Sequence, residues 1–276
     1  MNQLLGHQIL SSVKEYFSYR LLKDAAAYSN KTVTFYNYSD KVWTDKYVYG
    51  SPYAGFVYNS GVSGPTVCSG IYHPGFLPRS TGLHIDFRNG RIISDSALTG
   101  IITANVSIPD INAYVTTYSD YKLIAETNYL TWPNYQAATG YLSPNSHVLS
   151  SLFFRMGKTT NKTLAFGGQE WTIYNIKITA AMKDNYSLSA VADIIRDSQD
   201  RIFPIMTGTP LNEYNDLKSD WNYGNYMSNP PAYGLIYDSS FGHFENDVMA
   251  TNNPTLEFGL GSVEVRVARN PQSLFP

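Results

Sequence analysis

Cysteine and histidine are scarce in this sequence: the 276 residues include one cysteine, Cys68, and five histidines. A single cysteine cannot form an intrachain disulfide, and it excludes a metal site built on several thiolates. This composition favours a reducing compartment during synthesis. Cys68 itself is better interpreted as a small packed side chain than as a nucleophile.

Charged residues make up only 15% of the chain, and the formal net charge at pH 7 is −2. The sequence has no run of Lys and Arg, so a surface that wraps nucleic acid is not expected. It also has no stretch of about 18 apolar residues, and its N-terminus lacks a basic segment followed by an apolar run. Neither membrane insertion nor secretion is therefore indicated.

The motifs of several large enzyme classes are missing. We find no Gly-x-Ser-x-Gly elbow, phosphate loop, dinucleotide fingerprint or His-Glu-x-x-His helix. The nearest approach to a nucleophile elbow, Gly61-Val62-Ser63-Gly64-Pro65, lacks the spacing and is rich in turn-forming residues. We therefore expect a chain that is not an enzyme, with no catalytic, cofactor-binding or metal-binding residue.

Two groups of polar residues have the spacing of one face of a strand. His243, Glu245 and Asp247 could hold a divalent ion with help from elsewhere, but a solvated strand or loop face is the preferred interpretation. His84 and Asp86 repeat the spacing, and we interpret them as the polar face of a half-buried strand.

Aromatic and turn-forming residues are abundant instead, with 23 Tyr, 20 Gly and 14 Pro. Large amphipathic rings suit contact surfaces between proteins. The four tryptophans could also stack on sugars, although core or interface positions are the simpler interpretation: they are Trp43, Trp132, Trp171 and Trp221. A pair of distant carboxylates for glycoside hydrolysis stays open as a third possibility.

The N-terminus has the spacing of an amphipathic helix. Apolar residues recur every four positions at Leu5, Ile9, Val13, Phe17 and Leu21. This pattern predicts a helix from residue 2 to about 28 that packs on its own subunit.

From residue 31 to 141 the sequence consists of short β-rich runs broken by Gly, Pro, Asn and Asp, which is typical of a sandwich or barrel. The clearest hairpin covers residues 83–93, where Asn89-Gly90 predicts a type I′ turn. On the hairpin's first strand, alternating apolar residues predict one core-facing side. Further strands are predicted at 32–38, 53–58, 101–108 and 112–117.

The remaining chain alternates strand and helix. An apolar stripe predicts a helix over residues 187–203, with an N-cap at Ser187 and an end at Pro204. The stripe consists of Leu188, Val191, Ile194, Ile195 and Ile202. A loop is predicted over 211–229, and strands are predicted at 150–155, 171–180, 232–238 and 256–267. The expected fold class is β-rich α+β: residues 1–30 and 146–276 form one unit, and 31–145 form a sandwich or barrel-like inserted domain.

Three segments resemble the tail-terminator proteins of tailed phages: the strand and turn at 174–184, the helix at 188–202 followed by Phe203-Pro204, and the late strand at 256–267. The hairpin at 86–91 and the start at 2–8 are similar to virion structural proteins of contractile-tailed phages, including cyanophages. The β-rich stretch departs from the compact terminator pattern and would be an insertion.

The resemblance implies a mixed sheet with one packed helix, in a subunit of the phage neck that joins the head connector to the tail. Its partners would be further copies in a ring of six or twelve, and other neck, connector and tail proteins. DNA would pass through the channel only as cargo, no membrane would be involved, and the protein would reside in virions assembled in the host cytoplasm. The alternative is a β-rich decoration or receptor- and carbohydrate-binding protein of the virion.

Overall fold

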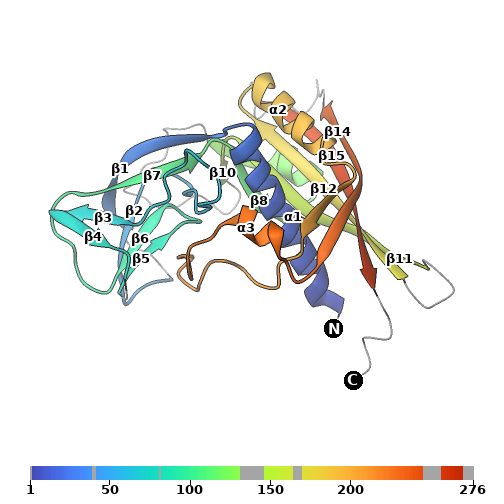
Figure 1. Cartoon of the computed structure of the whole chain (residues 1–276). Coiled ribbons are helices and arrows are strands. Elements are labelled where there is room, and N and C mark those ends of the chain that lie inside the picture. Colours follow the sequence, from blue (N-terminus) through green and yellow to red (C-terminus); the bar gives the residue numbers. More distant parts are fainter. Residues whose placement is uncertain are drawn as a thin grey trace.

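The chain folds into two β-sheets with a long N-terminal helix at their junction (Figure 1). The computed structural model describes residues 2–38, 42–80, 82–130, 146–163, 170–244 and 256–269. The expected β-rich α+β class is confirmed. Among the described residues, none of the helices combines the length and apolar character needed to cross a bilayer.

Helix α1 (Asn2–Asp24) confirms the predicted N-terminal helix. The expected stripe is buried from Ile9 onward, where Ile9, Val13 and Phe17 have no exposed surface, and Leu5 is partly buried. The helix ends before residue 28 because Ala26 adopts a positive φ of 47°, a left-handed conformation that stops a helix. The expected packing of this helix within its own chain is also confirmed, because its stripe belongs to the larger hydrophobic core.

A seven-stranded antiparallel sheet forms one half of the molecule, in the order β4-β3-β7-β1-β2-β6-β5. Its strands are β1 (Tyr28–Tyr38), β2 (Tyr47–Gly50), β3 (Gly70–His73), β4 (Gly75–Pro78), β5 (Leu83–Asp86), β6 (Arg91–Ser94) and β7 (Ile102–Pro109). The prediction of a strand at residues 53–58 is wrong. Phe56 donates its N–H to Phe87 and Val57 donates to Ser107, so the segment bridges two different elements and builds no ladder.

The predicted hairpin is present, but its turn differs from the prediction. Asp86 pairs with Arg91, which leaves residues 87–90 as a four-residue connection. Only Gly90 has a positive φ, because the backbone N–H and the side-chain amide of Asn89 both donate to the Asp86 carboxylate. The type I′ assignment is therefore wrong. Leu83, Ile85 and Phe87 are buried as expected.

The second sheet has six strands in the order β13-β14-β15-β12-β11-β8. They are β8 (Asn112–Val115), β11 (Ser151–Thr163), β12 (Glu170–Met182), β13 (Arg201–Pro204), β14 (Tyr233–Phe244) and β15 (Glu257–Arg269). Strand β8 pairs in parallel with β11, and the other neighbours are antiparallel. Residues 28–109 therefore build the whole seven-stranded sheet, whereas β8, which also lies in the stretch predicted as an inserted domain, belongs to the second sheet.

Helix α2 (Asn185–Arg196) begins two residues before the predicted start and ends seven residues before the predicted end, so Ile202 lies outside it and is 58% exposed. Its N-cap is Asp184, whose carboxylate accepts the N–H of Ser187, so the Ser187 assignment is wrong. Asp200, with a φ of 57°, turns the chain before Pro204, and residues 201–204 pair with β14 as β13. A short helix, α3 (Tyr223–Ser228), lies in the predicted loop.

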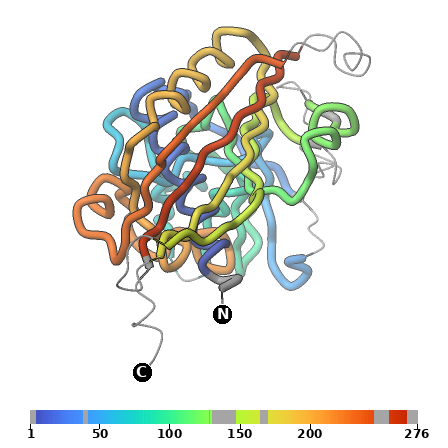
Figure 2. Tube along the Cα trace, turned by 90° about the vertical axis from the view of Figure 1, so that its right-hand side faces the viewer, coloured from blue at the N-terminus to red at the C-terminus, as the bar shows by residue number. Residues whose placement is uncertain are grey.

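Helices α1 and α2 cover the same face of the six-stranded sheet and share one core with it. Figure 2 faces the opposite side, where β14, β15, β12 and β11 run side by side in front of α1. A smaller core lies on that side and includes Leu123 and Ile124 of the π-helix η1 (Lys122–Glu126). A short parallel pair, β9 (Asn128–Leu130) and β10 (Ser146–Val148), follows this segment.

Candidate functional site

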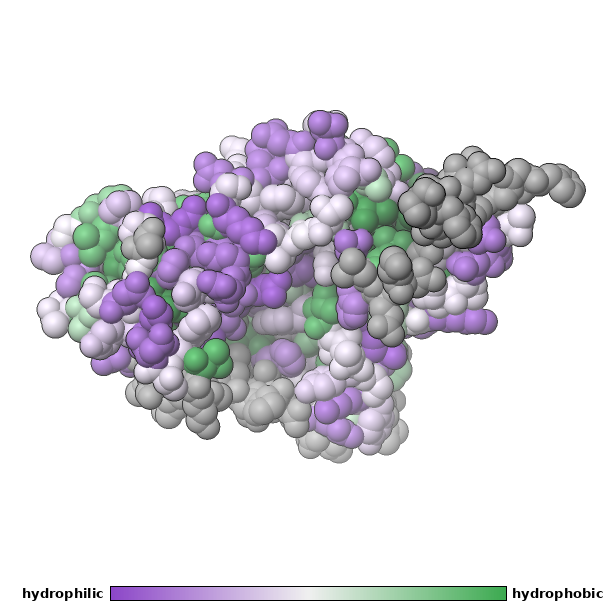
Figure 3. Space-filling model, turned by 90° about the horizontal axis from the view of Figure 1, so that it is seen from below, coloured by the Kyte–Doolittle hydropathy of each residue, from purple (hydrophilic) through white to green (hydrophobic). Residues whose placement is uncertain are grey.

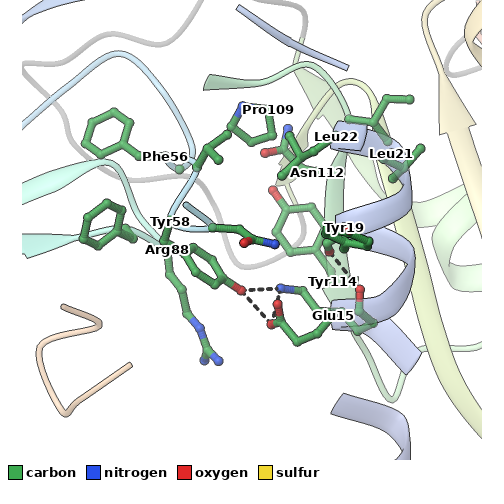
Figure 4. A pocket seen from close by; sticks show the side chains of 18 of the residues that line it. Glu15, Tyr19, Leu21, Leu22, Phe56, Tyr58, Arg88, Pro109, Asn112 and Tyr114 are labelled. Carbon is green, nitrogen blue, oxygen red and sulfur yellow. Dashed lines mark hydrogen bonds and ion pairs between the residues drawn. The ribbon is translucent and has the colours of Figure 1, made fainter. Parts of the chain in front are cut away.

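A cavity of about 360 Å³ lies where α1 meets the segment 54–59, the connection from β7 to β8 and the turn at 87–89 (Figure 4). The cavity sits at the junction of the two halves of the molecule. The side chains of Leu22, Phe56 and Pro109 make parts of its wall apolar. A small cluster of polar side chains lies at its α1 side.

Lys14, Glu15 and Tyr58 form this cluster, which we call the junction triad. The Tyr58 hydroxyl donates to Glu15 Oε1 at 2.6 Å, and Lys14 Nζ donates to the same oxygen at 2.9 Å. Lys14 Nζ also lies 3.1 Å from Tyr58 Oη. Figure 4 shows Tyr58 and Glu15 pointing toward each other from opposite sides of the cavity. Each member thus has the other two as partners.

The surroundings of Lys14 and Tyr58 keep both of these groups protonated near neutral pH. Burial by itself lowers the pKa of Lys14, but the Glu15 carboxylate and the Tyr58 oxygen raise it above its usual range on balance. Burial and the Glu15 charge raise the pKa of Tyr58. Near neutral pH the lysine is therefore charged and the tyrosine is a proton donor, so neither group is a general base.

The remaining polar groups around the cavity add little further chemistry. Burial raises the pKa of Tyr114 to about 12, so its hydroxyl stays protonated. Arg88 points away from α1 (Figure 4). With its charges neutralised internally, the site is suited to fastening α1 to the seven-stranded half and to holding at most a small, largely apolar molecule.

A second and wider cavity, of about 790 Å³, lies between the first turns of α1 and the outer half of β11. We call it the β11 groove. Its lining includes Gly6, His7 and Leu10 from α1, and Thr159 and Thr160 from β11. Strand β8 pairs with β11 only as far as Phe154. Beyond that residue, the described part of the chain places no further strand against this edge of β11.

The two strand-face groups have different surroundings: His243 is exposed on β14, as the interpretation of a solvated face predicts, whereas His84 is half-buried. His243 Nε2 lies 2.9 Å from Glu257 Oε2 on the neighbouring strand β15, while Glu245 and Asp247 lie outside the described residues. His84 stacks on Tyr214 with 4.0 Å between the ring centroids. No group of three or more His, Cys, Asp or Glu side chains in the described ranges is arranged to hold a metal ion.

The expectation that Asp86 lies on the polar face of a half-buried strand is wrong, because only 1% of the Asp86 surface is exposed. The segment 211–217 covers this side of β5: Asn215 accepts the N–H of Phe87, and the Asp216 carboxylate lies 3.4 Å from His84 Nδ1. Burial raises the pKa of Asp86, against the hydrogen bonds from Asn89 and the charge of Arg91.

Cys68 and the tryptophans have internal contacts. Cys68 is buried and its thiol donates to the carbonyl of Gly70 at 3.3 Å, and burial raises its pKa to about 11. Trp43 stacks on Tyr214, Trp221 contacts both large cores, and Trp171 is half-buried on β12. Trp132 lies outside the described residues. The Gly61–Pro65 segment forms a turn as expected, with Gly64 at a φ of 113°.

The sequence interpretation missed the junction triad, because it considered only the main apolar stripe of α1, and Glu15 lies outside that stripe. A usable signal was nevertheless present. Leu10, Tyr16 and Leu22 place further apolar residues outside the main stripe, which indicates a helix buried on more than one side. A charged pair inside such a helix needs a partner, although nothing local identifies Tyr58 as that partner.

No protein-family model matches this sequence, and a search of curated proteins finds no match either.

Proposed function

We propose that this chain is a structural subunit of a tailed-phage virion and forms a ring of six or twelve copies at the neck, between the head connector and the tail. The observation that carries the proposal is the open edge of β11. This strand has 13 residues, about twice the usual length, and no residue from Arg155 to Thr163 is buried. Within the described residues, about 30 Å of this edge has no strand partner, which favours pairing with another chain.

The chemistry of the candidate site supports a structural role over catalysis. Lys14 and Glu15 at the main cavity bind each other, and the thiol of Cys68 is buried with a raised pKa. A low net charge suits a channel through which DNA passes as cargo without strong binding. The partners in this proposal are further copies and the neighbouring neck, connector and tail proteins.

The proposal is tested by the copy number of this polypeptide in purified virions of the phage that encodes it. Quantitative mass spectrometry against the major capsid protein gives the number directly. We expect six or twelve copies, as a closed ring on the virion axis requires. Hundreds of copies would replace the neck assignment with a decoration or tail-tube role, and absence from virions would overturn the proposal.

A further inference from the structure

An apolar patch protrudes at the far end of the seven-stranded sheet. We call it the tip patch and define it by Tyr72, Phe76, Leu77 and Ile101. All four residues of β4 are exposed, with half of Phe76 accessible, and Ile101 is 78% exposed. Figure 3 shows hydrophobic atoms gathered at this end, which β3 and β4 form in Figure 1.

The register brings the larger side chains of the tip patch to one face. Tyr72 pairs with Phe76 on one side and with Thr103 on the other, and its ring lies 5.3 Å from the ring of Phe76. Ile101 precedes β7 by one residue, two positions from Thr103, and therefore shares this face. Grouped exposed apolar side chains of this size are typical of a contact surface.

Strand β4 also offers a backbone edge. It is the terminal strand of its sheet, and within the described residues its only ladder partner is β3. Its sequence, Gly75-Phe76-Leu77-Pro78, carries no charge. Within the described residues, the outer side of this strand is available to a further strand, apart from the missing N–H of Pro78.

The β11 groove has complementary properties. Its floor includes the apolar side chains of Leu10 and Met156, and one wall is the open edge of β11. Lys158 and Lys162 lie along that edge and disfavour pairing with a basic strand. An uncharged strand with two large apolar side chains fits both the edge and the floor, and β4 spans only about 13 Å of the available length.

The tip patch and the β11 groove lie at opposite ends of the molecule (Figure 1). We propose that the tip patch of one copy docks into the β11 groove of a second copy, with β4 extending the six-stranded sheet at β11. This proposal rests on the ring proposed above. Such a contact uses two different surfaces, so it repeats head to tail and can close into a ring.

Two complementary variants test this contact. Phe76→Asp adds a charge to the tip patch, and Thr159→Trp fills the β11 groove at an exposed position. Native mass spectrometry and sedimentation velocity of the purified full chain should show oligomers of six or twelve for the unaltered chain and monomers for each variant. We expect self-association to weaken by about thirtyfold or more in each, as the loss of a central contact does.

Mixing the two variants gives the deciding result. The Phe76→Asp chain keeps an intact groove and the Thr159→Trp chain keeps an intact tip, so the mixture should form one-to-one dimers that neither chain forms alone. Tyr186→Asp and Thr44→Trp place the same residues at exposed positions elsewhere, and these controls should assemble normally. Ile101→Asp replaces Phe76→Asp if the latter fails to fold.

The outcomes distinguish a failure of the proposed contact from a failure of the proposed ring. If the unaltered chain assembles and the tip and groove variants still assemble, or if their mixture stays monomeric, the contact is wrong and the ring proposal stands. If the unaltered chain itself stays monomeric at high micromolar concentration, both the contact and the ring are wrong.

Discussion

The hydroxyl of Tyr58 donates a 2.6 Å hydrogen bond to Glu15 Oε1 and so joins α1 to the segment that follows β2. Lys14 binds the same carboxylate oxygen. All three side chains lie at the cavity between the two halves of the molecule. The junction triad is therefore a polar link across an otherwise largely apolar contact, and its removal should affect stability.

Replacing Tyr58 with Phe removes one donor to Glu15 and keeps the ring. Because the carboxylate is buried, losing this donor should lower the free energy of unfolding by about 1–3 kcal/mol in urea denaturation. Tyr47→Phe alters a tyrosine that is 48% exposed and should have an effect within about 0.5 kcal/mol. Equal stability of Tyr58→Phe and the unaltered chain would contradict a stabilising role for the bond.

Removing the Glu15 charge alone should cost more than removing the pair. Glu15→Leu leaves the Lys14 ammonium without its carboxylate partner, so we expect a loss of about 3–5 kcal/mol. The double variant Glu15→Leu, Lys14→Met removes both charges and should recover part of that loss. A double-mutant cycle measures the difference, and additive single effects would show that the two charges are not coupled.

Asp184 should be the residue that starts α2. Asp184→Ala should lose about 1 kcal/mol, whereas Ser187→Ala, at the position that the sequence suggested, should lose within about 0.5 kcal/mol. The Ser187 N–H holds the pKa of Asp184 below its usual range. Asp184 therefore stabilises the folded chain fully above the usual aspartate pKa, and this stabilisation is lost as the pH falls through the lowered pKa of the folded state. The difference in the free energy of unfolding between Asp184→Ala and the unaltered chain should therefore become smaller in acid.

Gly90 should not tolerate a side chain. Its φ is 61°, and a Cβ atom there would lie 2.2 Å from the carbonyl oxygen of Tyr53. Gly90→Ala should lower the free energy of unfolding by more than about 1 kcal/mol. Gly208→Ala, where no atom lies within 4 Å of the added Cβ, is the matched control and should leave stability nearly unchanged. Comparable losses in both variants would show that the turn is not specially constrained.

Cys68 should be unreactive in the folded chain. Burial raises its thiol pKa to about 11, so little thiolate is present at pH 8 and the sulfur is shielded from reagents. A disulfide reagent should modify the thiol slowly in buffer and rapidly in guanidinium chloride. Because the folded pKa is raised, the contribution of this thiol to stability is present below its unfolded pKa and is lost as the pH rises toward 11. Rapid modification without denaturant would contradict this burial.

The sequence predicts well those elements that depend on local periodicity. The stripe from Ile9 to Leu21 gives α1, the core-facing residues of α2 are buried as expected, and β7 lies within a residue of its predicted bounds. In each case the apolar spacing of a single segment determines which side faces the core. Such patterns identify the elements, but not the partners of each one.

The errors come from interactions that the local sequence does not contain. The turn after Asp86 depends on a carboxylate that accepts from Asn89, and the end of α2 depends on β13 pairing with β14. The junction triad is a stronger case, because Tyr58 is 43 residues from Glu15 and only the folded chain brings them together. These contacts override the local signals of Pro204, which predicted the helix end, and of Asn89-Gly90, which predicted a type I′ turn.

Strand β15 is the last strand of the described chain, yet it lies between β14 and β12 in the middle of its sheet. Its valines at 263, 265 and 267 belong to the core that also holds α1. During translation α1 emerges first and has to wait for residues 257–269 before this core can close, whereas the strands of the seven-stranded sheet are complete by residue 109. A stop codon or a protease cut before residue 257 would therefore remove a central strand and leave α1 without much of its apolar contact.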